Sequence, residues 1–174
     1  MKINFLKISL VTSLLLPFVF GCSPAFDWRV YYATENDWQA FFPSKPFKKV
    51  RDLNLLIDDT PVQLKMTQNS TKVNKMVFTV DCSELLDKKT EVLQLSERLV
   101  ISLEKNFKLK NKKKLSKNIY SYSGVFPTSK KPDVEIKLLA LILSKDNFII
   151  RGVVYGQSDS FLQDEAMFFL NSIK

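Results

Sequence analysis

The side chains that could carry out chemistry are few in this sequence. Histidine is absent from the 174 residues, which removes the usual general base near neutral pH and the commonest metal ligand. The chain has two cysteines, Cys22 and Cys82, and only four glycines. A Ser-His-Asp or Cys-His mechanism therefore cannot be built, and a glycine-rich loop that cradles phosphates is nearly excluded. Composition thus argues against the main hydrolase and nucleotide-binding classes.

Two short spacings remain to be weighed. Ser102 and Lys105 match the S-x-x-K spacing of penicillin-binding proteins and class A β-lactamases, but the companion motifs are missing, so coincidence is favoured. Asp81, Glu84 and Asp87 could hold a cation. The favoured alternative places them at a turn and a helix N-terminus, where carboxylates meet free backbone amides. We expect no catalytic residue, no metal and no cofactor.

The N-terminus has the layout of an export signal. Lys2 and Lys7 flank the start of an uncharged, mostly apolar run over residues 8–20, which is too short to cross a bilayer. The segment Val19-Phe-Gly-Cys22 that closes it resembles the lipobox of bacterial lipoproteins. This resemblance implies that residues 1–21 are removed and that Cys22 is lipidated. The alternative is cleavage after Ala25, which would release a soluble protein.

The lipobox resemblance also implies a location. Each buried acyl methylene contributes about 0.8 kcal/mol, so two or three chains hold a protein on a membrane almost permanently. The residue after Cys22 is Ser23 rather than the Asp typical of inner-membrane retention, which implies the periplasmic face of the outer membrane. Loss of Lys2 and Lys7 would leave 24 basic and 18 acidic residues, a net charge of +6. Nucleic acid is not an expected partner in this compartment.

Lysines are concentrated in residues 105–117. They are Lys105, Lys108, Lys110, Lys112, Lys113, Lys114 and Lys117. This run could bind anionic lipid heads, lipopolysaccharide phosphates or an acidic envelope protein, since each lysine near an anionic surface contributes roughly 1 kcal/mol. The alternative, which we favour, is a solvated loop and edge strand whose lysines prevent unwanted strand pairing.

Two further features have a functional and a structural interpretation. Residues 22–36 are expected to be a lead-in from the anchor, and aromatic side chains are frequent there and just beyond it: Phe26, Trp28, Tyr31, Tyr32 and Trp38. They could form a partner or membrane patch, but packing across the domain is favoured. Cys82 could be a redox site, although a small buried side chain at a strand end is the favoured interpretation.

Hydropathy predicts strands before the first long helix. Apolar runs or alternation over residues 38–42, 50–57, 62–67 and 76–80 indicate four strands, and a turn at residues 58–61 predicts that the second and third form a hairpin. Over residues 87–107 the period changes. Val92, Leu95, Leu99 and Leu103 then form one apolar stripe of a helix, which Asp87 or Thr90 could cap.

The C-terminal half repeats this order. Residues 119–126, 134–143 and 148–155 predict strands, the second of them central because both of its faces become apolar. Ser160 and Gln163 predict a capping box for a last helix with Leu162, Ala166, Phe169 and Ile173 buried. Residues 37–174 should therefore form one α+β domain, a largely antiparallel sheet of about six to seven strands covered by two helices.

Short motifs in this order carry two family resemblances. Residues 38–46, Trp-Gln-Ala-Phe-Phe-Pro-Ser-Lys-Pro, and residues 168–173, Phe-Phe-Leu-Asn-Ser-Ile, resemble the opening strand and closing helix of Mog1/PsbP-like domains. The segment Cys-Ser-Pro-Ala-Phe-Asp-Trp-Arg at residues 22–29 resembles a group of proteobacterial lipoproteins. Together they imply a membrane-anchored, non-enzymatic binding or accessory protein of the envelope. The alternative is a carrier that holds a small apolar ligand between helix and sheet.

Overall fold

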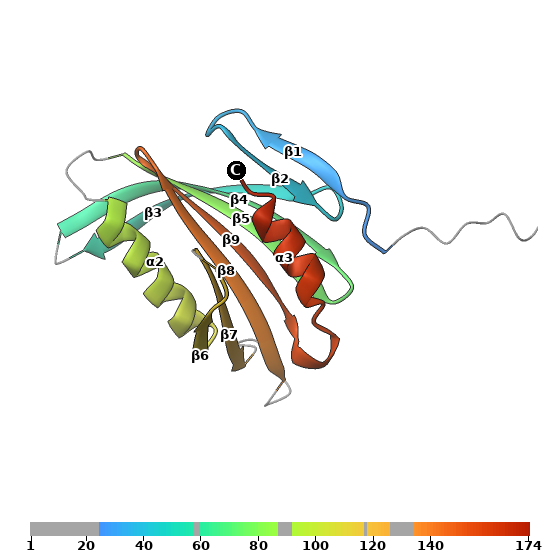
Figure 1. Ribbon diagram of the computed structural model, residues 1–174. Coiled ribbons are helices and arrows are strands. Elements are labelled where there is room, and N and C mark those ends of the chain that lie inside the picture. Colours follow the sequence, from blue (N-terminus) through green and yellow to red (C-terminus); the bar gives the residue numbers. More distant parts are fainter. Residues whose placement is uncertain (1–24, 58–59, 87–91, 117, 126–133) are drawn as a thin grey trace, which may run out of the picture.

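The computed structural model describes residues 25–57, 60–86, 92–116, 118–125 and 134–174. Within these ranges the chain forms a seven-stranded antiparallel sheet in the order β3-β4-β5-β9-β8-β7-β6. Its strands are β3 (Phe47–Ile57), β4 (Thr60–Val73), β5 (Met76–Leu85), β6 (Lys110–Lys114), β7 (Ile119–Val125), β8 (Glu135–Lys145) and β9 (Phe148–Gln157). Helices α2 (Val92–Asn106) and α3 (Gln163–Asn171) lie over this sheet, with a short hairpin beside α3 (Figure 1). The predicted α+β class and strand number are confirmed.

The predicted hairpin of the second and third strands is also confirmed. β3 and β4 pair in continuous register from Phe47↔Ser70 to Ile57↔Thr60. Along β4, Val62 and Leu64 are buried while Gln63 and Lys65 are exposed, because successive side chains of a strand point to opposite faces. The alternation that is visible in the sequence therefore fixes which face of this edge packs on the core.

The centre of the sheet is buried on both faces. In β8, the consecutive residues Leu138, Leu139 and Ala140 are almost inaccessible, and β8 lies between β7 and β9, as predicted for a central strand. β5 is buried in the same way from Phe78 to Ser83, although Thr79, Asp81 and Ser83 are polar. Two separate layers therefore cover the two faces.

The first layer is α3 together with the hairpin of β1 (Arg29–Ala33) and β2 (Trp38–Phe42). Aromatic rings join it to the sheet: Phe169 of α3 lies 5.1 Å from Phe42 and 5.4 Å from Phe78, both in edge-to-face geometry. Beyond α3, the backbone of Lys174 exchanges two hydrogen bonds of 3.1 Å with Gln39 of β2. The end of the described chain thus ties the hairpin to the helix.

The second layer is α2, whose apolar stripe was predicted. Leu95, Leu99 and Leu103 are buried, and they belong to two smaller clusters. Leu95 and Leu99 pack with residues of β3 and β4, whereas Leu103 packs with Tyr122 and Val153. The suggested caps Asp87 and Thr90 lie outside the described residues.

The prediction of a capping box for the last helix, with Leu162 buried, is wrong. The first helical residue of α3 follows Leu162, which is 42% exposed, and no side chain caps this end. Ser160 instead belongs to a 3₁₀ turn (Ser158–Ser160), so the expected capping box does not form. β1 also lies within the stretch expected to be a lead-in before residue 37. β1 pairs with β2 in antiparallel register from Arg29↔Phe42 to Ala33↔Trp38.

None of the helices in the described part of the chain is both long enough and apolar enough to cross a membrane.

Candidate functional site

The lysine run folds into an edge strand. β6 pairs only with β7 among the described strands, and all five of its residues are exposed. Asn111 adopts a positive φ of 53°, where the register shifts between Lys110 and Lys113. Such an irregularity bends an edge strand and disrupts its ladder. The expectation of an edge strand rich in lysine is therefore confirmed for residues 110–114. Lys117 lies outside the described residues.

One lysine of β6 is held by its neighbours. Lys112 Nζ lies 3.3 Å from Glu104 of α2, and 5.0 and 5.7 Å from the ring centres of Tyr120 and Tyr122. Desolvation lowers the pKa of Lys112, but Tyr122 and Glu104 together raise it above its ordinary value. Burial has the opposite effect on the Tyr122 hydroxyl and raises its pKa. Lys112 thus connects β6 to the end of α2.

The other lysines of this strand are available to solvent. No carboxylate of the described residues lies within ion-pair distance of Lys110, Lys113 or Lys114. Register places Lys113 opposite Ser121 and Lys114 opposite Tyr120, so these two neighbours project to opposite faces of the sheet edge. The result is a cationic ridge, named here the β6 ridge and consisting of Lys110, Lys113 and Lys114.

A groove lies between α2 and the β3 side of the sheet. Its volume is about 570 Å³, within the range of about 300–1,000 Å³ that is common for small-molecule sites. Its apolar wall consists of Leu53, Leu55, Leu56, Met66, Leu99, Ile101, Leu103 and Phe107. Its polar lining consists of Arg51, Gln68, Arg98, Ser102, Lys105, Asn106 and Arg151, a set with four cations and no acid. We call it the α2 groove.

The floor of the α2 groove contains a buried ion pair. Arg151 of β9 donates from Nη2 to Asp81 Oδ2 at 2.6 Å and from Nε at 3.1 Å, and its Nη1 donates to the carbonyl oxygen of Leu99 at 3.3 Å. The pair forms because β5 and β9 place Asp81 directly opposite Arg151. The placement of Asp81 at a turn before the helix was therefore wrong: it is a mid-strand carboxylate.

The carrier alternative expected a site between helix and sheet, but sequence reasoning did not identify the residues that line the α2 groove. A signal was present in β3, where Arg51, Leu53 and Leu55 occupy alternate positions and so share one face. Nothing in the sequence showed that α2 leaves part of that face open. The lysine run and the groove meet at Lys105, which both include.

The aromatic lead-in is mostly structural. Phe26 and Trp28 stack at 5.6 Å, and Trp28 contacts Phe168 of α3 at 4.8 Å. Tyr31 packs on Trp38 at 5.7 Å, so the favoured interpretation is confirmed for four of the five rings. Tyr32 is 65% exposed and is the exception.

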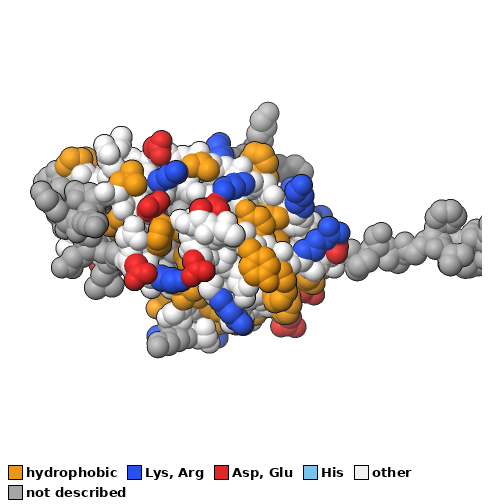
Figure 2. Space-filling view, turned by 90° about the horizontal axis from the view of Figure 1, so that it is seen from above, with side chains coloured by type: hydrophobic (Ala, Val, Ile, Leu, Met, Phe, Trp, Pro, Cys, Tyr) orange, Lys and Arg blue, Asp and Glu red, His pale blue; other side chains and the backbone are white. Residues whose placement is uncertain are grey.

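Some apolar surface remains on the hairpin side. Val30, Tyr32, Phe41 and Phe168 are exposed, and Phe41 stacks on Phe168 at 5.8 Å. Figure 2 shows hydrophobic side chains gathered near the end where the described chain begins, with lysine and arginine among them. The patch is small and continuous with the packed rings below it.

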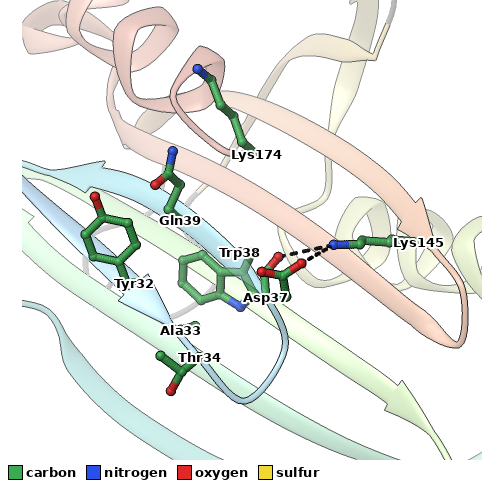
Figure 3. A pocket seen from close by; sticks show the side chains of 8 residues that line it. All are labelled: Tyr32, Ala33, Thr34, Asp37, Trp38, Gln39, Lys145 and Lys174. Atoms are coloured by element: carbon green, nitrogen blue, oxygen red, sulfur yellow. Dashed lines mark hydrogen bonds and ion pairs between the residues drawn. The ribbon is translucent and has the colours of Figure 1, made fainter.

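A shallow cleft of about 390 Å³ opens beside the hairpin turn (Figure 3). Asp37 and Lys145 form an ion pair of 2.6 Å across it. The hydrogen bond from Lys145 lowers the pKa of Asp37, and the same bond raises that of Lys145. The cleft thus presents a neutral, exposed pair, which joins the hairpin to the β8–β9 turn.

The remaining candidates are the Cys82 thiol, the Ser102–Lys105 pair, whose members both line the α2 groove, and the acidic residues. Cys82 is 1% exposed, and burial raises the pKa of its thiol to about 12, which suits the predicted structural role rather than redox chemistry. Ser102 and Lys105 are exposed on α2. Among the described residues, no three potential metal ligands lie together, and Cys22 and Asp87 are outside them.

No protein-family model, curated protein sequence or solved structure matches this chain.

Proposed function

We propose that this chain is a lipid-anchored lipoprotein of the bacterial envelope that binds an anionic envelope component and catalyses no reaction. The observation that carries the proposal is the β6 ridge, three exposed lysines on a sheet edge with no described carboxylate beside them. Such a surface attracts an anionic partner over about a Debye length, roughly 8–10 Å at physiological salt. The anchor would be Cys22, on the periplasmic face of the outer membrane.

The position of the β6 ridge bears on the kind of partner. The described chain begins beside β1 at the right of Figure 1, whereas β6 lies at the lower left. Three residue steps, from Cys22 to Ala25, span at most about 11 Å, so the anchoring membrane would lie close to β1. The ridge would then be directed away from that membrane. Its partner would be an acidic protein or another anionic component beyond the anchoring lipids.

The anchor is tested by the intact mass of the protein purified from membranes of its own host, beside a Cys22→Ala variant. The expected mass corresponds to residues 22–174 with a diacylglycerol and an acyl group, and the variant should lack the lipid. A mass of residues 26–174 without lipid would contradict the anchor and support cleavage after Ala25.

The β6 ridge is tested with a photo-crosslinking residue at Ser116, which is exposed and follows the strand. The triple variant K110Q/K113Q/K114Q retains Lys112 and its contacts with α2, and should lose the crosslinked partner. A matched variant, K45Q/K72Q/K75Q, removes three exposed lysines elsewhere and should keep it. Equal crosslinking in both variants would contradict a binding role and leave prevention of unwanted strand pairing as the role of these lysines.

The Mog1/PsbP-like resemblance belongs to the same proposal. It is supported by the position of its two motifs: residues 38–42 form the strand β2, and residues 168–171 belong to the closing helix α3. These elements pack together through Phe42 and Phe169. A shared fold does not transfer a function, so the resemblance adds only an expectation of a binding or accessory role.

A second candidate function is that of a small-ligand carrier. The observation that favours it is the α2 groove, whose wall is mainly leucine and whose volume suits a small molecule. A carrier would hold its ligand between helix and sheet.

A further inference from the structure

The α2 groove has two chemically different ends. Register runs from Arg51↔Met66 through Leu53↔Leu64 to Leu55↔Val62, so the β3 side of the groove changes from cationic to apolar along the strand. Met66 of β4 pairs with Ser83 of β5, and Ser83 pairs with Ile149 of β9. Arg51 therefore lies in the same row of the sheet as Ile149, which is two residues from Arg151 along β9. Along β3, the lining therefore begins with Arg51 and continues with Leu53 and Leu55 toward the β3–β4 turn, while Arg98 lies on α2 beside Leu99.

The cationic end has an excess of positive charge. Asp81 neutralises Arg151, but no described carboxylate lies within ion-pair distance of Arg51 or of Lys105. Arg51 and Lys105 are both exposed, and a charge-assisted hydrogen bond from either cation to a carboxylate is roughly twice as strong as one between neutral groups. The apolar end includes Leu56, which is 69% exposed, and Ile101, which is 42% exposed. Burial of these side chains by a hydrocarbon chain would be favourable.

We infer that the α2 groove binds a single-chain anionic amphiphile of the fatty-acid type. Its carboxylate would lie between Arg51 and Lys105, and its acyl chain would run along Leu53, Leu55, Leu56 and Ile101. A groove of about 570 Å³ has room for one chain rather than two, which distinguishes this ligand from a diacyl phospholipid. The inference rests on the second candidate function, that of a carrier, and specifies the ligand class.

The lining also excludes a phosphate-binding site of the usual backbone type. The groove is lined by strand faces, by residues from the C-terminal part of α2, where the helix dipole is negative, and by Phe107, which follows the helix. Attraction of the headgroup must therefore come from side chains. The two cationic side chains of Arg51 and Lys105 are sufficient to bind one carboxylate.

The test uses the full chain in membranes of its own host and a palmitate probe with a diazirine in the middle of the chain. After irradiation, labelled peptides are expected from α2 and β3. The same probe with an alcohol in place of the carboxylate should require at least about tenfold more ligand for equal labelling, a typical difference for one charged contact. The variant R51Q/K105Q should show a similar loss, while the matched variant K110Q/K114Q on β6 should label as the parent does.

Four outcomes would overturn the inference. Equal labelling by the acid and alcohol probes would remove the anionic headgroup but leave the carrier function in place. Absence of label from α2 and β3 with both probes would remove the carrier function as well. An equal loss in R51Q/K105Q and K110Q/K114Q would show general charge attraction rather than a site, and labelling by a diacyl phospholipid probe at the same peptides would replace the proposed ligand.

Discussion

The two faces of the sheet are covered in different ways. On the face of α3 and the hairpin, Phe42, Phe78 and Phe169 interlock edge to face and leave a closed core. On the face of α2, the aliphatic core divides into two clusters, and Arg151 with Asp81 lies between Ile149 of one cluster and Val153 of the other. The comparison indicates that stability is concentrated on the first face, while the second retains open space and uncompensated charge, on which the proposed ligand site depends.

Among the substitutions that test this difference, Phe169→Ala should lower the free energy of unfolding most. The ring is fully buried between β2 and β5, so its removal should lower the free energy of unfolding by about 3–5 kcal/mol. Urea unfolding monitored by tryptophan fluorescence measures it. Phe168→Ala is the matched control, because Phe168 is half exposed, and it should cost far less.

The second-largest loss of stability is expected from breaking the buried ion pair on the α2 face. Asp81→Ala leaves the guanidinium of Arg151 buried without its partner and should lower the free energy of unfolding by about 3 kcal/mol. The double variant D81A/R151M removes both charges and should recover most of that loss. A double variant that is no more stable than Asp81→Ala would mean that the pair itself contributes the stability.

Gly152→Ala tests how closely α3 approaches the sheet. An added Cβ would collide with Ile173 and lie 2.8 Å from Leu170 Cδ2, so the free energy of unfolding should fall by about 1–3 kcal/mol. Gly156→Ala places its Cβ 3.0 Å from the more adaptable Met76 and should cost less. Equal losses would indicate that α3 does not pack more tightly than the rest of this face.

The cations of the α2 groove should contribute little to folding. R51Q/K105Q should change the free energy of unfolding by no more than about 0.5 kcal/mol, because both side chains are exposed and neither has a described ion-pair partner. A loss comparable to that of Asp81→Ala would mean that these cations stabilise the fold rather than serve ligand binding.

The smallest effect is expected at the hairpin turn. The pKa of Asp37 is lowered by Lys145, so the contribution of this pair is present above the ordinary carboxyl pKa and is lost as pH falls through the lowered value. In a carboxyl NMR titration, Asp37 should titrate below its usual range, and Lys145→Gln should return it there. An unchanged titration in the variant would remove this link between the hairpin and the β8–β9 turn.

Periodicity in the sequence was sufficient to predict α2, β8 and the β3–β4 hairpin, because each of them buries a regular set of side chains. It did not indicate β1, because Arg29–Ala33 lacks an alternating apolar pattern, and the edge strand β6 was expected from its lysines rather than from periodicity. Asp81 and Arg151 are far apart in the chain, so their pairing follows from sheet register alone. The α2 groove depends on where one helix sits over the sheet, which no local pattern contains.

The most direct test of the division between the two faces is hydrogen–deuterium exchange of the full chain in phospholipid nanodiscs, with and without palmitate. Exchange should slow in α2 and in the facing parts of β3 and β4, and stay unchanged in β1, β2 and α3. Slowing confined to the hairpin and α3, or no slowing in α2 and β3 at saturating palmitate, would contradict the assignment of binding to the α2 face.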